Sequence, residues 1–403
     1  MKAAFSPIWL PLDALVLAVR SFLPLAFFYT VGRVAHDLIL VGAAFTGADA
    51  GPRKYLGFAV MSMAVLATLA SYVAMLQVLR RSVALTGGPG NRTGRITTVI
   101  AHTLLPFLAF YGAWGLFVDD VRQYSILSQE LFGLDRIDNV TFDPLLLTSV
   151  IALGAFLVKL GVDTAHTRLG RTWLGPLVTV FEALWMFFAV ISVESFISAR
   201  VEWLTSRAAW AGAADLLGTV LGPVGDAVTA VVPDLRDALL LPLVWLTIAA
   251  VVYGRDMGAG EALIEGTRLQ PGAGRVRAAA PGPVRKAAEF VSRDLRGKYT
   301  PMLHGLRLVL RAGPVFYLVF CLCYALLEAG REWAFIGVTR LVGPHDGPWW
   351  TVWHGPVRFG VTAVYEVLRF SLLASALQMA LRTASDGRGP RAAEPAAPRP
   401  AKS

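Results

Sequence analysis

Residues 103–120, TLLPFLAFYGAWGLFVDD, form the clearest copy of a unit that recurs along this chain. An apolar run begins just before a proline, aromatic residues follow a few positions later, and acidic residues mark its end. A run of this length and composition is typical of a helix that crosses a bilayer and leaves it at the charged residues. We therefore expect the rest of the chain to consist of similar membrane helices.

The composition of the whole chain supports the same fold class. Of its 403 residues, 55% are hydrophobic and only 16% are charged, and the mean hydropathy is +0.57. Soluble domains are less apolar than this. The apolar runs are continuous, whereas an outer-membrane barrel would alternate residue by residue. We predict an all-α integral membrane protein.

The charged residues and cysteines exclude several other classes. The formal charge is +9, but Lys and Arg lie in loops beside apolar helices and form no stripe interleaved with aromatics, so no nucleic-acid partner is expected. Cys321 and Cys323 are the only cysteines, and their spacing turns them to different sides of a helix. We interpret both as core residues rather than a disulfide or a metal site. No cofactor is expected.

Eight transmembrane helices in four hairpins are predicted. The eight spans are residues 15–36, 55–78, 96–118, 144–162, 173–193, 238–253, 306–327 and 357–381. Residues 1–382 would then be one polytopic helical domain, followed by a disordered cytoplasmic tail at 383–403 that is rich in Pro and Ala. No cleavable signal peptide is expected, because prolines and charges interrupt the first apolar run.

One outer segment does not fit a simple span. Residues 194–236 carry scattered charges and spaced tryptophans, and their apolar part, residues 211–232, is nearly long enough to cross a membrane. Asp215 and Asp226, with the Gly222–Pro223 pair, favour amphipathic helices that lie on the surface or re-enter it.

The distribution of Lys and Arg predicts the topology. The loops at 82–95, 163–172 and 254–305 are basic, and the positive-inside rule places them and both termini in the cytoplasm. The acidic segments at 119–143 and 194–236 are then external. Many Ala, Gly, Arg and Pro residues with few Lys indicate a GC-rich bacterial genome, so we expect the bacterial plasma membrane.

The predicted hairpins resemble one another. Each outbound helix begins near a proline, at Pro24, Pro106, Pro176 and Pro314. Tyr29, Tyr111 and Tyr317 follow three of these prolines at a nearly constant offset. Two interpretations stay open: internal duplication, with parallel repeats about an axis along the membrane normal, or the general abundance of prolines and aromatics in membrane helices.

Three charges are predicted near the bilayer midplane, namely Glu182, Glu366 and Arg369. Each costs at least about 2.5 kcal/mol there unless it faces a partner or a water-filled cavity. Glu366 and Arg369 are three positions apart on one helix and can pair, which leaves Glu182 without a local partner. Either these charges line a transport path, or they are structural and a neighbouring helix satisfies Glu182.

Arg33, His36 and Asp37 are predicted to lie on one helical face at the outer membrane boundary. This polar cluster is interpreted as an interfacial anchor with one salt bridge, or as a site for a lipid headgroup or a metal. Lys159 and Asp163 lie near a cytoplasmic helix end, where they can pair or extend to the interface.

Catalytic motifs are missing from the sequence. Neither Gly-x-Ser-x-Gly nor His-Glu-x-x-His occurs. Loose metal-ligand spacings occur at Asp135/Asp138, Asp234/Asp237 and His345/His354, and none of them is assigned as a metal site. His102 is interpreted as a core residue.

These features lead to three functional hypotheses. The first is a non-enzymatic transport component or permease-like subunit, whose path passes Glu182 and the Glu366/Arg369 pair. The second is a scaffold or assembly protein, in which the basic insertion at 254–305 binds anionic lipid or a protein partner, each basic residue contributing about 1 kcal/mol. The third is a lipid-modifying membrane enzyme.

Overall fold

The computed structural model describes residues 7–47, 53–82, 107, 108, 111, 116–133, 145–171, 173–254 and 313–386. All regular structure within these residues is helical, and six of the helices are long and apolar enough to cross a membrane. The fold is therefore that of a helical membrane protein, as predicted. The predicted number of eight spans is not confirmed.

The N-terminal region forms two helices where one was predicted. After the short 3-10 turn Pro7–Trp9, α1 covers Leu10–Arg20 and α2 covers Phe22–Thr46. The backbone at Ser21 leaves the helical region, with φ −111° and ψ 13°. The prediction of one helix at 15–36 is wrong at both ends, because α2 begins at Phe22 and continues past His36 for almost three more turns.

Helix α3, Arg53–Ser82, lies along α2 at close range. A Cβ atom added at Gly32 would lie 2.2 Å from Cβ of Ser71, and the Ser71 hydroxyl donates a hydrogen bond to the Phe28 carbonyl at 2.8 Å. At the other end of the pair, Gly47 meets Gly57. Small residues thus bring the two backbones together, as is common between membrane helices.

Helices α6, Leu145–Leu169, and α7, Leu174–Thr205, form a second pair of neighbours. The Ser192 hydroxyl of α7 donates to Oγ1 of Thr148 on α6 at 3.0 Å. A single turn joins the helices at Gly170, whose φ of +62° is easily adopted only by glycine.

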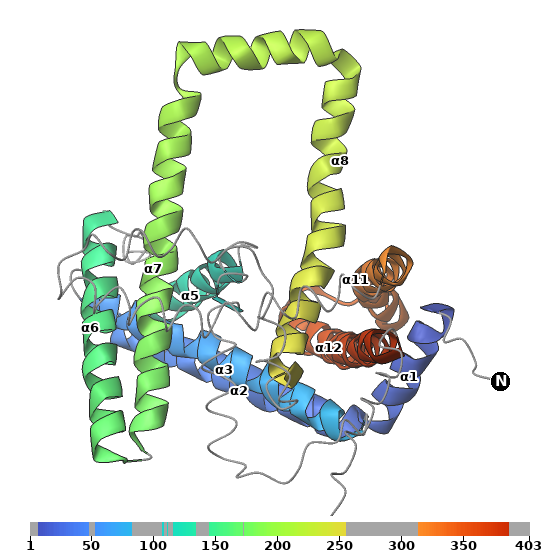
Figure 1. The fold of residues 1–403 in the computed structure, drawn as a ribbon, viewed down its shortest axis with the longest axis horizontal. Coiled ribbons are helices and arrows are strands. Elements are labelled where there is room, and N and C mark those ends of the chain that lie inside the picture. Colours follow the sequence, from blue (N-terminus) through green and yellow to red (C-terminus); the bar gives the residue numbers. More distant parts are fainter. Residues whose placement is uncertain are drawn as a thin grey trace, which may run out of the picture.

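The outer segment at 194–236 is also helical, and its predicted place on the membrane surface or as a re-entrant pair stays a prediction. Helix α7 continues to Thr205, and α8 covers Ala208–Gly254 with a kink at Gly222, where φ is +46° and ψ is −137°. Figure 1 shows α7 and the later part of α8 as the uprights of an arch and the first part of α8 as its crossbar, and the upper half of the arch stands away from the other helices. The predicted sixth span is the last part of α8, whose apolar stretch Asp237–Tyr253 is shorter than a membrane span.

Four further predictions fall on or near residues that the structure leaves undescribed. Most of the third predicted span, 96–118, lies outside the described residues, as do most of the basic insertion at 254–305 and the tail beyond Asp386. The acidic segment that follows residue 118 was predicted as a loop, but its first part belongs to helix α5, Leu116–Phe132.

Helices α11, Pro314–Val342, and α12, Gly347–Asp386, form the third pair. Both are longer than predicted, because the aromatic segment between them is itself helical. Helix α12 also contacts α1, α2, α3 and α8, so its C-terminal half lies in the apolar core.

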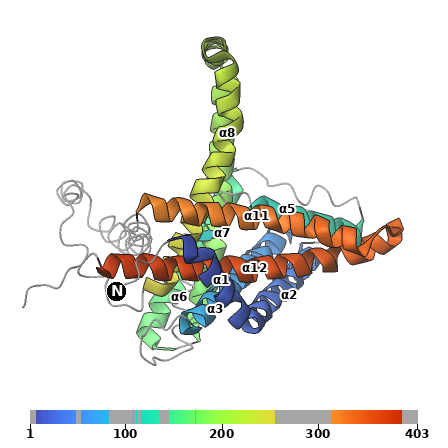
Figure 2. The same ribbon diagram turned by 90° about the vertical axis from the view of Figure 1, so that its right-hand side faces the viewer.

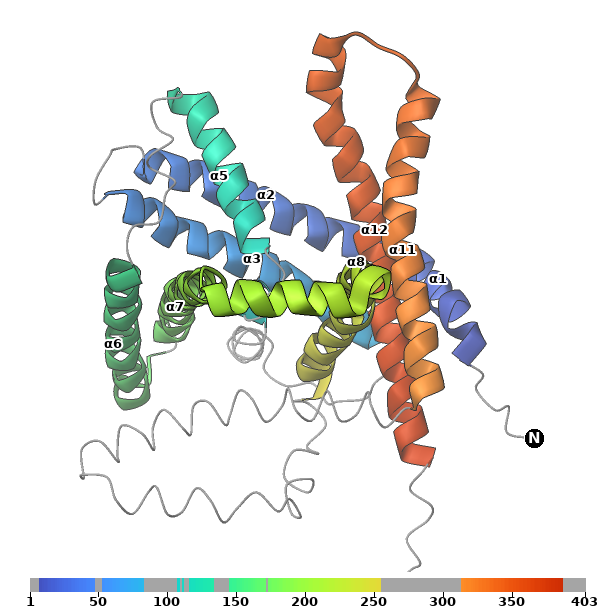
Figure 3. The ribbon, with the colours of Figure 1, turned by 90° about the horizontal axis from the view of Figure 1, so that it is seen from above.

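The three pairs run in different directions. Figure 1 shows α6 and α7 upright and α2 and α3 lying across them, while Figures 2 and 3 show α11 and α12 running along a third direction. The predicted arrangement of eight helices in four hairpins is therefore not confirmed. One flat bilayer cannot have all three pairs along its normal.

Candidate functional site

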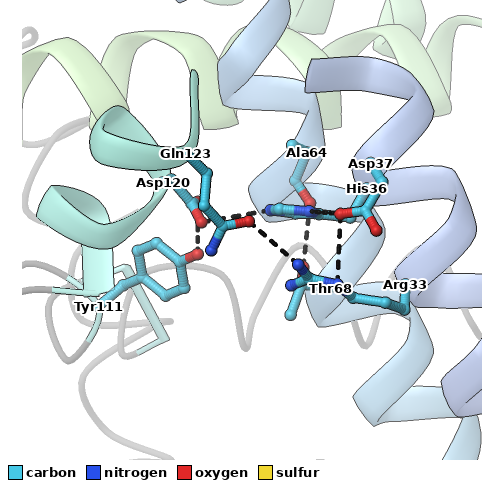
Figure 4. A network of polar contacts seen from close by, with 8 residues as sticks. All are labelled: Arg33, His36, Asp37, Ala64, Thr68, Tyr111, Asp120 and Gln123. Carbon is cyan, nitrogen blue, oxygen red and sulfur yellow. Dashed lines mark hydrogen bonds and ion pairs between the residues drawn. The ribbon is translucent and has the colours of Figure 1, made fainter. Parts of the chain in front are cut away.

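The first candidate site is a polar cluster between α2 and α5, which we call the His36 cluster: Arg33, His36, Asp37, Tyr111, Asp120 and Gln123 (Figure 4). His36 Nε2 lies 3.3 Å from Oδ1 of Asp120, and its Nδ1 lies 3.1 Å from Oδ1 of Asp37. The Tyr111 hydroxyl donates to the other oxygen of Asp120 at 2.5 Å. The side chains of His36 and Asp120 are almost fully buried.

The geometry around His36 favours the form of the imidazole that is protonated on both nitrogens. Both ring nitrogens face a carboxylate oxygen, and an imidazole satisfies two such acceptors only when both nitrogens carry protons. The positive charges of Arg33 and His36 then match the negative charges of Asp37 and Asp120. Opposite charges and hydrogen bonds together offset the cost of burying these groups.

One end of the His36 cluster reaches the protein surface. Arg33 Nε lies 3.2 Å from Oδ1 of Asp37, and the exposed fractions of the two side chains are 39% and 52%. Arg33 also donates to the Gln123 amide oxygen at 3.0 Å. The buried imidazole of His36 is therefore connected to the protein surface through Asp37.

The predicted polar cluster of Arg33, His36 and Asp37 does form: Asp37 pairs with Arg33 at 3.2 Å and with His36 at 3.1 Å. The sequence predicted that the helix ends there, at a membrane boundary. However, α2 continues to Thr46, and the three residues lie near its middle. Among the described residues no group of three or more potential ligands could hold a metal ion. The alternative that Arg33, His36 and Asp37 bind a lipid headgroup stays a prediction.

The second candidate site lies among α3, α8, α11 and α12, and we call it the Arg369 cluster: Tyr72, Trp245, Tyr324, Glu328, Arg331, Tyr365, Glu366, Arg369 and Phe370. Nη2 of Arg369 lies 2.6 Å from Oε2 of Glu366, so the pair predicted from the sequence is present. Both side chains are more than nine-tenths buried.

Aromatic rings surround the Arg369 guanidinium. Its central carbon lies 4.3 Å from the ring centroid of Trp245, and 5.3–5.5 Å from those of Phe370, Tyr72 and Tyr365. The faces of such rings attract a cation, and the attraction strengthens when water is excluded. The aromatic box therefore replaces much of the hydration that Arg369 loses on burial.

Several polar atoms of the Arg369 cluster have capacity for further hydrogen bonds. Within the described part of the chain, Nε and Nη2 of Arg369, Oε2 of Glu366 and the Tyr324 hydroxyl are buried without a hydrogen-bond partner. The 2.6 Å ion contact lacks the alignment of a hydrogen bond and so leaves these atoms available. Buried polar groups are rarely left in this condition in native proteins.

The Arg369 cluster also extends to the protein surface. The Tyr365 hydroxyl donates to Oε2 of Glu328, and Glu328 pairs with Arg331 at 2.9 Å. Arg331 also contacts Glu332 at 3.0 Å, and all three of these charged side chains are partly exposed.

Two tyrosines lie between the clusters. Tyr29 is close enough to interact electrostatically with Arg33 and Asp37 on one side and with Glu366 and Arg369 on the other. Tyr72 interacts with Arg369 and with Tyr111, and the ring of Phe107 lies 6.2 Å from Tyr72 and 5.4 Å from Tyr111. Electrostatic interactions of these tyrosines therefore connect the His36 cluster with the Arg369 cluster.

Glu182 lies on α7, whereas the residues of the two clusters come from other helices. It is buried in α7 and takes part in an interaction with another group. Lys159 on the paired helix α6 is also buried. Whether Glu182 lines a transport path stays a prediction.

Sequence reasoning missed the partners that come from other helices, including Asp120, Tyr72 and Trp245. One signal was available in the sequence. When the units at Pro24 and Pro106 are aligned, Asp37 matches Asp119, which directly precedes Asp120, the acid that contacts His36. The metal-ligand spacings gain no support from the described residues. Asp135 and Asp138 lie outside them.

Comparison with protein-family models, with curated proteins and with solved structures gives no match. Function therefore has to be argued from the two clusters.

Proposed function

We propose that this protein is a component of a membrane transport system and that protons move along the side chains between Asp37 and Glu328. The observation that carries the proposal is the presence of two buried charge clusters, each with a partly exposed charged end, whose tyrosines interact electrostatically across the interior. Burying charges costs several kcal/mol per ion even after relaxation. Ionisable groups inside membrane segments commonly mark ion or proton paths.

The two clusters would serve different steps of such a path. His36 would pass a proton from Asp37 to Asp120, because its two ring nitrogens contact these two carboxylates. Glu366 holds or releases a proton beside the fixed positive charge of Arg369, whose own proton does not leave at physiological pH. Tyr29, Tyr72 and Tyr111 would relay protons between them through their hydroxyls and bridging water.

The test is proton flux in liposomes that contain the purified protein, driven by a potassium gradient with valinomycin. We expect wild-type protein to acidify the interior, and His36→Gln and Glu366→Gln each to lower the rate at least about tenfold. Glu202→Gln is the matched control, since this exposed carboxylate on α7 belongs to neither cluster. Equal flux in all four proteins, or no flux in any of them, would contradict the proposal.

A second candidate function is a membrane scaffold, favoured by the arch of α7 and α8. Beyond Val193 the side chains of α7 are exposed nearly all round, including Phe196, Ile197 and Trp203. Such a surface suits a protein partner or lipid. In this alternative the two clusters only stabilise the fold, and the basic insertion at 254–305 binds anionic lipid. Removal of residues 265–300 would then abolish function, while Glu366→Gln would be tolerated.

The proposal is non-enzymatic, with a multi-pass chain in the bacterial plasma membrane and both termini in the cytoplasm. The positive-inside distribution of Lys and Arg supports this orientation. A lipid-modifying enzyme is the third alternative. It would require a polar cavity open to one membrane face and lined by residues such as Asp37 and Arg33.

A further inference from the structure

The end of the α11–α12 pair, residues 333–357, has an unusual surface, and we call it the aromatic tip. It contains Trp333, Trp349, Trp350 and Trp353 together with His345 and His354, while Arg340 and Asp346 are its only charged residues. Figure 3 shows the tip as the part of the pair that extends beyond all neighbouring helices.

The rings of the tip are held by one another. The imidazole of His345 lies 4.1 Å from the ring of Trp349, which stacks on Trp353 at 5.8 Å and meets Trp350 edge-on at 5.0 Å. Across the pair, the rings of Phe335 and His354 are 5.3 Å apart. The Trp349 amide donates to Oδ1 of Asp346, which caps the start of α12.

The outward side of the tip is apolar although little of the protein covers it. The exposed fraction is 88% for Leu341, 69% for Trp333 and 66% for Val352. Apolar side chains in such density are costly in water and mark a contact with lipid or protein.

The charges on α12 define how far the tip lies from the centre of a bilayer. Between Arg358 and Arg382 the helix has 23 residues, and at about 1.5 Å per residue they span roughly 35 Å, slightly more than the hydrocarbon layer of about 30 Å. Arg358, which contacts the ring of Phe335, would then lie at the hydrocarbon edge. Trp353, five residues further out, would lie about 7 Å beyond that edge, at the level of the headgroups.

We propose that the α11–α12 pair crosses the bilayer and that its aromatic tip lies in the phospholipid headgroup layer. Tryptophan rings favour this layer, because their apolar bodies contact acyl chains while the indole N–H groups reach carbonyl and phosphate oxygens. The tip has few charged residues, which favours contact with lipid over exposure to water. The inference is independent of proton transfer, and it identifies which of the three helix pairs lies across the membrane.

The depth of single nitroxide labels tests the proposal. Cys321→Ala/Cys323→Ala provides a background free of native cysteines, and Leu341→Cys, Trp353→Cys and Val364→Cys are labelled one at a time. The proteins are placed in phosphatidylethanolamine–phosphatidylglycerol vesicles, and power saturation with oxygen and with a nickel chelate measures depth. Val364 is the matched control, because it is also exposed on α12 but lies about six residues inside Arg358.

We expect the labels at 341 and 353 to lie within the headgroup layer, which is roughly 5–7 Å thick, and the label at 364 to lie in the hydrocarbon. Labels at 341 and 353 that are fully accessible to nickel would overturn the proposal and leave a protein partner as the cover of the tip. Equal depth at all three positions would also overturn it, since the pair would then lie in the membrane plane.

A second variant tests whether the tryptophans hold the tip in place. Trp349→Ser/Trp350→Ser/Trp353→Ser should move the label at 341 toward water, whereas substitution of the same three residues by Phe should move it less. Melting curves of all variants provide the control for folding. An unchanged depth in a folded serine variant would overturn the role of the rings.

Discussion

The His36 cluster and the Arg369 cluster bury charge in two different ways. Around His36 each charge meets an opposite charge on a neighbouring residue or helix, through contacts of 3.1–3.3 Å, and one end stays exposed. Around Arg369 a single close partner lies on the same helix, and aromatic faces from other helices surround the cation. The first solution depends on the relative positions of helices, whereas the second depends on a local pair enclosed by a packed core.

The largest effect is expected where a charge would lose its only close partner of opposite sign. Arg369→Met should lower the free energy of unfolding by about 3–5 kcal/mol, because Glu366 would stay buried beside an apolar side chain. Thermal or denaturant unfolding in detergent measures the loss. The double variant Glu366→Gln/Arg369→Met should recover most of it, and an equal loss in both variants would mean that the aromatic box, not the ion pair, determines stability.

The next effect concerns contacts between helices. Asp120→Asn should destabilise by about 1.5–3 kcal/mol, because His36 and Tyr111 would both lose a charged acceptor. Asp37→Asn is the matched control, with an expected cost below about 1 kcal/mol, since its side chain is half exposed. Similar unfolding free energies for the two variants would show that burial of the cluster contributes little.

The third prediction tests the helix contact that positions the His36 cluster. Gly32→Ala should cost about 1–3 kcal/mol, because its methyl group would lie 2.2 Å from Cβ of Ser71 and would push α2 and α3 apart. Gly42→Ala lies on the same helix with nothing within 4 Å and should be neutral or slightly stabilising. Circular-dichroism melting distinguishes the two, and an equally stable Gly32→Ala would contradict the close packing.

The smallest effect is expected at Tyr124, beside the His36 cluster. Its hydroxyl is buried against Gly47 and Gly57 and has no hydrogen-bond partner within the described residues. Burial raises the pKa of Tyr124, so the hydroxyl stays neutral. Tyr124→Phe should therefore change the unfolding free energy by no more than about 0.5 kcal/mol, whereas Tyr111→Phe, which removes a donor to Asp120, should cost about 1–3 kcal/mol. A larger loss at Tyr124 than at Tyr111 would reverse the comparison.

The sequence by itself determined the properties that depend on neighbouring residues. Continuous apolar runs predicted a helical membrane protein, because helix length and side-chain polarity are local. The spacing of Glu366 and Arg369 predicted their pairing for the same reason, since residues three apart on a helix are neighbours. Helix ends were less accurate: polar residues within α2 resembled a membrane exit, although a buried network satisfies them.

Only the tertiary structure decided which distant groups meet. His36 and Asp120 are 84 positions apart, and Trp245 reaches Arg369 from a different helix, so no local pattern connects them. The directions of the three helix pairs were likewise hidden, because an apolar helix packs equally well at several angles until specific small and large side chains interdigitate. The charges were visible in the sequence, and packing determined which of them are partners.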